Sequence, residues 1–266
     1  MAETILPSKT RYEGTYGCAH WRGEVVADAD VFSEYMRGRV RDYVADADTG
    51  DPFAAEIRGL ATTGVETEFV EKLLRAVPDS VSWEVGEALA QCIVSQDDKR
   101  EITWPWNTVR DRRVPRASLP GADLVGFCRK DDVVLLLFGE VKTSSDPTVP
   151  PNVMYGGSGM TWQLHENATR LDVQHVLLKW LRTRCSSQEY IKLYRGAVQR
   201  YLKSQGKEIL LIGILLRDTP PDERDIKSRA IALAKELISP TQIEIVAWYL
   251  PVQISKWAAL VQRGAA

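Results

Sequence analysis

Three residues near the middle of the chain have the types and spacing of a metal-dependent hydrolytic site. Glu140 and Lys142 stand two positions apart, directly after the apolar run Val133 to Phe138, and Asp123 lies upstream of that run. Two carboxylates supply the hard oxygen ligands that Mg²⁺ prefers, and the bound ion can orient a water molecule toward a phosphate. A lysine beside them can stabilise the negative charge that develops on the scissile phosphate. Together these residue types indicate phosphodiester hydrolysis.

A hairpin must bring Asp123 to the other two residues. The apolar run predicts a strand that is buried on both faces. A turn centred on Lys130–Asp131 would, counting back along both strands, pair Asp123 with Phe138. Opposed residues project to the same side of a sheet, and Phe138 shares its side with Glu140 and Lys142. We therefore predict that the three charged side chains converge on one face.

Asp123 and the Glu140-Val141-Lys142 triplet at the end of an apolar strand resemble the PD-(D/E)xK nuclease superfamily. The proline of the family motif has no strict match, since Pro120 is separated from Asp123 by Gly121 and Ala122. The resemblance implies an α/β, restriction-endonuclease-like core with a central mixed β-sheet flanked by helices. It also implies Mg²⁺, or Mn²⁺ in its place, bound by Asp123 and Glu140, with Lys142 as the catalytic cation.

A helix before the hairpin adds to the resemblance. Apolar residues at 81, 85, 89, 92 and 93 predict a helix over Ser82 to Val94, with Glu84 and Glu87 on another of its faces. Superfamily members often place one more acidic ligand on such a helix. The resemblance thus implies Glu87 as a catalytic residue and metal ligand, with Glu84 in reserve. The alternative is that both are solvated helix charges.

Patterns downstream of the hairpin predict the rest of the core. The expected elements are helical stretches over Leu164 to Arg184 and Val198 to Gly206, a strand over Ile209 to Leu216, a helix over Asp222 to Leu237 and a strand over Ile243 to Leu250. This order resembles the superfamily core across residues 80 to 250. We therefore predict a nuclease-like core over residues 80–266. Residues 1–79, with helical patterns at 31–44 and 65–77, are predicted to form a mainly helical extension that docks a partner or regulates the core.

Charge is distributed unevenly along the chain. Residues 1–109 hold 11 Lys and Arg against 20 Asp and Glu, a net −9, whereas residues 110–266 hold 23 against 16, a net +7. A polyanion such as DNA could follow the basic groups past the metal site. The alternative is that they are solvated helix charges. The basic residues concerned are Arg110, Arg112, Arg113, Arg116, Lys179, Arg182, Arg184, Lys192, Arg195, Arg200, Lys203 and Lys207.

Several features favour one class of protein over another. The four cysteines are scattered without a C-x-x-C pair, so reduced thiols are expected and neither a disulfide framework nor a zinc knuckle is indicated. No segment is long and apolar enough to span a bilayer, and the cytoplasm is the expected compartment. The glycine-rich segment Tyr155 to Met160 lacks the lysine of a P-loop and is predicted to be a flap. On the next helix, superfamily members often place a polar residue that faces the site, and His165, Gln174 and His175 are candidates for it. The alternative is that the histidines are surface or core residues.

These observations lead to one functional hypothesis and two alternatives. The hypothesis is a Mg²⁺-dependent deoxyribonuclease. The helix around Glu87, the strand around Asp123 and the Glu140-Val141-Lys142 triplet look similar to the nuclease subunit of Hachiman-type antiphage systems, which implies control by a helicase partner. One alternative is a restriction-type endonuclease that acts alone. The other is a non-catalytic DNA-binding or scaffold member of the same fold.

Overall fold

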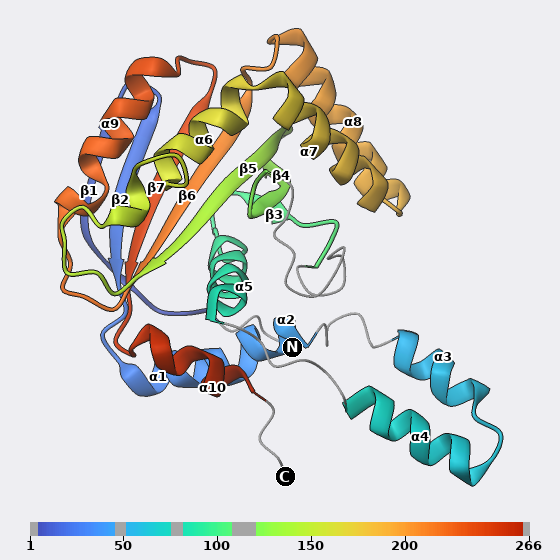
Figure 1. Cartoon of the computed structure of the whole chain (residues 1–266). Coiled ribbons are helices and arrows are strands. Elements are labelled where there is room, and N and C mark those ends of the chain that lie inside the picture. The colour runs from blue at the N-terminus through green and yellow to red at the C-terminus, as the bar shows by residue number, and fades with distance from the viewer. Residues whose placement is uncertain (1–4, 46–51, 76–81, 108–120, 263–266) are drawn as a thin grey trace.

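The structure is a computed structural model that describes residues 5–45, 52–75, 82–107 and 121–262 (Figure 1). These residues form one seven-stranded mixed sheet in the order β1-β2-β7-β6-β5-β4-β3. Strands β2, β7, β6 and β5 run parallel, whereas β1, β4 and β3 pair antiparallel with their neighbours. The strands are β1 (Lys9–Tyr16), β2 (Ala19–Val25), β3 (Glu101–Thr103), β4 (Leu124–Lys130), β5 (Val133–Ser144), β6 (Ile209–Arg217) and β7 (Gln242–Tyr249).

Helices cover both faces of the sheet (Figure 1). One face, which we call the α6 face, is covered by α6 (Met160–Thr169), α7 (Leu171–Arg184), α8 (Gln188–Lys203) and α9 (Lys227–Glu236). The other face, the α5 face, is covered by α5 (Ser82–Val94), α1 (Ala29–Tyr35), a π-helical segment (Met36–Val40) and α10 (Trp257–Val261). Helices α2 (Arg41–Val44), α3 (Pro52–Leu60) and α4 (Gly64–Arg75) complete the N-terminal part.

The central strands are apolar on both sides because each separates two cores. On β5, Leu136 and Phe138 belong to the core under the α6 face, and Leu135, Leu137 and Val141 belong to the core under the α5 face. Side chains alternate along a strand, so the even-numbered residues of β5 point toward α6. This alternation confirms the prediction that the strand is buried on both faces. It also assigns Glu140 and Lys142 to the α6 face.

The predicted elements of residues 80–250 are present. Helix α5, the β4–β5 hairpin, α6 to α8, β6, α9 and β7 follow one another in the predicted order. The helical stretch predicted over Leu164 to Arg184 is divided at Arg170, whose extended backbone separates α6 from α7. The α/β class and the helix-flanked mixed sheet are therefore confirmed. In the described residues, no helix is long and apolar enough to cross a membrane.

The prediction of a mainly helical extension is wrong for residues 9–25. These residues form β1 and β2, and β2 pairs with β7 along its whole length. The cause lies in the sequence of β1, where nearly every residue is exposed and polar, so the alternation that would signal a half-buried strand is missing. The N-terminal part of the chain thus extends the same sheet as the core, and its helices begin only at α1.

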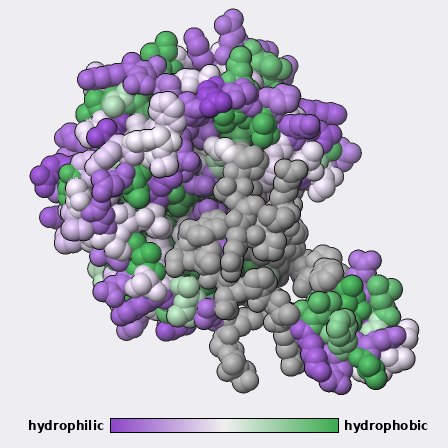
Figure 2. All heavy atoms as spheres, in the orientation of Figure 1, coloured by the Kyte–Doolittle hydropathy of each residue, from purple (hydrophilic) through white to green (hydrophobic). Residues whose placement is uncertain are grey.

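Helices α3 and α4 form an antiparallel pair that projects from the rest of the chain (Figure 1). Val65, Phe69 and Leu73 recur every fourth residue on α4, and their exposed fractions are 80%, 64% and 45%. Leu60 at the end of α3 is also exposed. Figure 2 shows apolar residues gathered on this pair. Such an accumulation of exposed apolar side chains is typical of a surface that another protein covers.

Candidate active site

The β4–β5 hairpin brings Asp123 and Glu140 opposite one another. Its turn consists of Asp131 and Asp132, with Asp131 at φ 53°, so Lys130 pairs with Val133. The predicted pairing of Asp123 with Phe138 is therefore wrong by two residues. Continuing the observed register beyond the pair Leu124–Gly139 sets Asp123 against Glu140. A shift of two residues leaves every side chain on its predicted face, so the expected convergence holds.

Asp123 joins the two strands at the point where their pairing ends. Its backbone N–H donates to the carbonyl of Gly139 at 3.0 Å. Its carboxylate Oδ2 accepts a hydrogen bond from the backbone N–H of Val141 at 2.8 Å. The Asp123 side chain thus accepts the hydrogen bond that a backbone carbonyl would accept if the pairing of β4 with β5 continued. These two bonds hold the Asp123 carboxylate beside Glu140.

Glu140, which is buried, and Lys142, which is partly exposed, form an ion pair on the same face. The Lys142 Nζ lies 2.7 Å from Glu140 Oε1, and their side chains are 19% and 2% exposed. The other oxygen of Glu140, Oε2, is buried and has no hydrogen-bond partner. A buried carboxylate oxygen without a partner is costly, since it has lost water and gained nothing in return. This oxygen is available to a cation.

Burial also changes the acidity of the pair. Burial raises the pKa of Glu140 to about 9, and the negative charge of Asp123 adds to the rise. The Lys142 ammonium acts in the opposite direction and offsets part of the increase. Two carboxylates so close together cannot both ionise readily, which favours the protonated form of Glu140. A divalent cation would replace that proton.

The donor set of this pair fits Mg²⁺ or Mn²⁺. Asp123 and Glu140 offer carboxylate oxygens, and Glu140 Oε2 is the buried oxygen without a partner. Within the described ranges, no group of three or more His, Cys, Asp and Glu side chains is arranged to hold a metal ion. The protein ligands that the structure brings together are therefore two. Mg²⁺ is commonly held by one or two carboxylates with water and substrate phosphate as its other ligands.

Glu87 lies on a helix that packs against the opposite face of the sheet. Its neighbours Val85, Ala88 and Leu89 belong to the core under the α5 face. A Cβ on Gly86 would lie 2.7 Å from Thr143 Cγ2, so this part of α5 sits tightly against the end of β5. Glu87 is partly buried there, as is Glu84, and neither completes a three-carboxylate group with Asp123 and Glu140. The predicted role of Glu87 as a third ligand stays a prediction.

Helix α7 borders the site from the other side. Gly121, two residues before Asp123, has φ +94°, and a Cβ on it would lie 3.1 Å from Val173 Cγ1 and 3.8 Å from Leu177 Cδ2. The backbone reaches the hairpin through a left-handed conformation that favours glycine. A larger residue here would also press on α7. Gly121 therefore positions Asp123 through both its conformation and its size.

Of the three polar residues expected to face the site from the next helix, two have other partners and one is exposed. His165 Nε2 lies 3.2 Å from Glu236 Oε2 on α9. Gln174 is buried and accepts a hydrogen bond from Tyr201. His175 is exposed. None of the three has a recorded contact with Asp123, Glu140 or Lys142.

Gln163 on α6 is the polar residue that sequence reasoning missed. Met160 and Leu164 of this helix face Gly213, which pairs with Glu140. Gln163 precedes Leu164 on this helix and lies on a different side of it from His165, which contacts α9. Its Oε1 is buried without a hydrogen-bond partner. In the sequence, the available signal is a polar residue next to the apolar Leu164 on the first helix after Glu140-Val141-Lys142.

Basic residues of α7 and α8 lie over the same face as the site. Leu177, Leu181 and Leu193 of these helices pack in the core under the α6 face. On their outer surfaces the exposed residues Lys179, Arg182, Lys192, Arg195 and Lys203 form no recorded ion pair with another described residue. Arg200 by contrast pairs with Glu208 at 2.8 Å. The predicted contacts of Arg110, Arg112, Arg113 and Arg116 lie outside the described residues.

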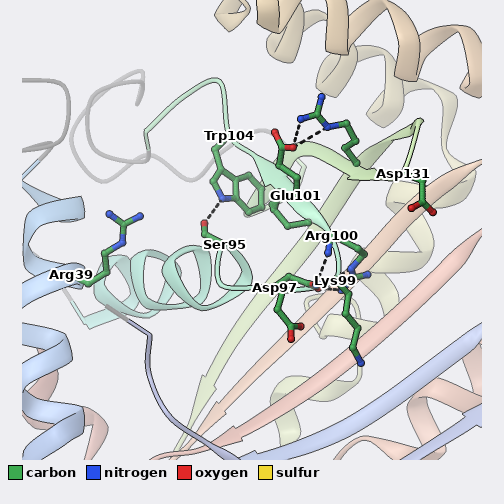
Figure 3. Close-up of a pocket in the computed structure, with 11 residues that line it drawn as sticks. Arg39, Ser95, Asp97, Lys99, Arg100, Glu101, Trp104 and Asp131 are labelled. Atoms are coloured by element: carbon green, nitrogen blue, oxygen red, sulfur yellow. Dashed lines mark hydrogen bonds and ion pairs between the residues drawn. The ribbon is translucent and has the colours of Figure 1, made fainter. Parts of the chain in front are cut away.

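An open pocket of about 670 Å³ is separate from this site. It lies between the end of α5, β3 and the tip of the β4–β5 hairpin, and Figure 3 shows that some of its charged residues are paired, Arg100 with Asp97 among them. Arg100 pairs with Asp97, Arg129 pairs with Glu101, and the Trp104 indole N–H donates to Ser95. The charged side chains in these pairs are neutralised by one another, so they do not point together at a bound ligand. None of these paired side chains presents a buried oxygen without a partner, as Glu140 does.

Comparison with known proteins adds no family to this description. No protein-family model, curated protein or solved structure gives a significant match to the chain.

Proposed function

We propose that the protein is a metal-dependent nuclease that hydrolyses phosphodiester bonds in DNA. The observation that carries the proposal is the cluster of Asp123, Glu140 and Lys142 at the end of one hairpin, with Glu140 buried at its centre. Two carboxylates and one ammonium group meet there, and one carboxylate oxygen has no partner. A restriction-endonuclease-like core is part of the same proposal. The order α5, β3, β4, β5, α6 and β6 supports it.

Each residue of the cluster has a separate role in the proposed reaction. Asp123 and Glu140 would hold Mg²⁺, which when bound polarises a phosphate oxygen and orients the attacking water. The Val141 N–H keeps the Asp123 carboxylate in place. Lys142, close to Glu140 and partly exposed, can donate to an oxygen of the scissile phosphate as negative charge develops there. Exposed lysines and arginines of α7 and α8 would bind neighbouring phosphates.

Cleavage of supercoiled plasmid by the purified chain tests the proposal. Wild type is incubated with Mg²⁺, with Mn²⁺ and with EDTA, beside Lys142→Ala and Lys256→Ala. Lys256 is an exposed lysine next to α10 and serves as the matched control. Nicking by wild type and Lys256→Ala that is lost in Lys142→Ala and in EDTA supports the nuclease. Cleavage that survives Lys142→Ala contradicts it, and metal-independent DNA binding without cleavage favours the non-catalytic alternative.

The apolar α3–α4 pair favours a second, partner-controlled form of this function. Val65, Phe69 and Leu73 are exposed together on α4, as expected of a surface that binds another protein. The resemblance to Hachiman-type systems implies a helicase as that protein. Affinity purification from the native host tests this, with Phe69→Glu as the variant that should lose the partner. Recovery of no helicase by wild type, together with cleavage by the isolated chain, favours an endonuclease that acts alone.

A further inference from the structure

A hollow of about 450 Å³ lies on the side of α6 that faces away from the Glu140 site. The loop at residues 155–157, α6 and α9 enclose it. Its volume is in the range that small ligands occupy in proteins. Most of the lining is apolar, with Leu233 and Ala232 of α9 forming part of the wall. The hollow uses none of the residues assigned to phosphodiester hydrolysis.

Two aromatic side chains stand at this hollow with much of their surface exposed. Trp162 is 50% exposed and Tyr155 is 39% exposed. Large aromatic rings are usually covered, and when exposed in a concave site they present flat faces for stacking. The Tyr155 hydroxyl donates to Asn152 Oδ1 at 2.7 Å, which restricts the ring. The rings therefore offer a surface suited to a planar ligand.

Arg229 supplies a positive charge at the same hollow. Its guanidinium lies 5.0 Å from the centre of the Tyr155 ring. Its Nε is buried without a hydrogen-bond partner, and within the described part of the chain Arg229 has no recorded ion pair. The nearby carboxylate of Glu236 is instead 3.2 Å from His165. A guanidinium with an unpartnered Nε–H beside two aromatic rings is suited to a phosphate group.

The loop leaves room for a ligand to enter. Gly156 has φ +81°, and a Cβ added to Gly156 or Gly157 would meet nothing within 4 Å. Both glycines therefore face open space. A bulky occupant can be accommodated without moving the strands of the sheet.

We propose that this hollow binds a nucleobase stacked on Trp162 and Tyr155, with its phosphate held by Arg229. The base comes from an unpaired position of a nucleic-acid strand or from a free nucleotide, because both present the same planar ring and phosphate. The His165–Glu236 pair lies where the polar edge of the base would be read. This site does not depend on the proposed cleavage reaction, since it needs neither the metal nor Lys142.

Binding is measured in EDTA, so that cleavage plays no part. A fluorescein-labelled single-stranded decamer, the matching duplex and AMP are titrated against wild type, Trp162→Ala, Trp162→Phe, Arg229→Gln and Arg224→Gln. Arg224 is an exposed arginine just before α9 that pairs with Asp222 and serves as the matched control. We expect Trp162→Ala and Arg229→Gln each to weaken binding of the decamer about tenfold. Trp162→Phe and Arg224→Gln should stay within about twofold of wild type, because they keep a stacking ring and the Arg229 charge.

Titration with AMP distinguishes a free nucleotide from a nucleic-acid strand as the source of the base. Two results would contradict the proposed site. Competition by AMP with the same dependence on Trp162 identifies a free nucleotide, whereas binding of the decamer alone identifies a strand. Decamer binding that is equal in all five proteins overturns the proposal, as does absence of binding by both decamer and AMP. Thermal melting of each variant verifies folding. Because metal is absent throughout, a failure of the nuclease proposal leaves these results unchanged.

Discussion

The carboxylate of Asp123 accepts a hydrogen bond from the backbone N–H of Val141, the residue between Glu140 and Lys142. This single bond links the two halves of the candidate motif. It gives Asp123 a structural role in addition to its proposed role as a metal ligand, because it satisfies a backbone donor of β5 just before β4 begins.

Substitution of Asp123 should separate these two roles. Asp123→Asn keeps an acceptor for the Val141 N–H and removes the charge, so it should fold normally but bind Mg²⁺ at least about tenfold more weakly. Asp123→Ala also leaves the N–H unpaired and should lower the free energy of unfolding by about 1–3 kcal/mol. Calorimetric titration with Mg²⁺ and urea unfolding measure the two effects. Equal stability of the two variants would show that the hydrogen bond contributes little.

Removal of the Lys142 ammonium should affect the reaction more than metal binding. We expect Lys142→Ala to lower the cleavage rate by about 10²–10³-fold, since the charge on the phosphate loses its partner. The metal ligands remain, so a Mg²⁺ heat should still be observed. Single-turnover cleavage and calorimetry measure these quantities. Loss of the metal heat in Lys142→Ala would assign Lys142 to the metal site itself.

The raised pKa of Glu140 predicts how stability without metal depends on pH. The folded pKa, about 9, is above the ordinary value of 4.5, so this residue's contribution to stability is complete below pH 4.5. It is lost progressively as pH rises toward 9, by up to about 1.4 kcal/mol per pH unit. Glu140→Gln carries no such titration and should become more stable than wild type near pH 9. Urea unfolding at pH 5, 7 and 9 in EDTA compares them, and parallel profiles would refute the assignment.

Glu87 should matter less to metal binding than Asp123 does. The structure brings Asp123 and Glu140 together, whereas Glu87 belongs to a helix on the opposite face of the sheet. We therefore expect Glu87→Gln to reduce Mg²⁺ affinity less than Asp123→Asn does. Calorimetry on both variants decides the question. Equal losses would restore Glu87 as a ligand of equal importance.

The contact between α5 and β5 predicts a destabilising variant that can be rescued. A Cβ on Gly86 would lie 2.7 Å from Thr143 Cγ2. Gly86→Ala should therefore lower the free energy of unfolding by about 1–3 kcal/mol through overpacking. Thr143→Ser removes the offending methyl group, so the double variant should recover part of the loss. A double-mutant cycle with no coupling would show that α5 moves instead.

The core could be predicted because its strands and helices have strong sequence patterns. The position of the hairpin turn and the unpartnered polar atoms have no such pattern. The long apolar runs of β5, β6 and β7 indicated buried strands, and α5 and α9 showed clear helical periods. The hairpin turn was misplaced because Lys130, Asp131 and Asp132 are all polar, so the sequence does not distinguish one turn from the next. The face of Asp123 was nevertheless correct, since only an odd shift changes it. The orphaned oxygens of Glu140 and Gln163 depend on packing and cannot be read from a pattern.

The pairing of β2 with β7 affects how the chain can fold. The two strands are close to opposite ends of the sequence, yet they lie side by side through the whole length of β2. Contacts between such distant segments close a very long loop and are expected to form slowly. During synthesis the β1–β2 hairpin cannot complete this pairing until β7, which lies far downstream in the sequence, has also been made. A protein that begins after residue 79 would leave β7 as an apolar sheet edge, open to pairing with other molecules.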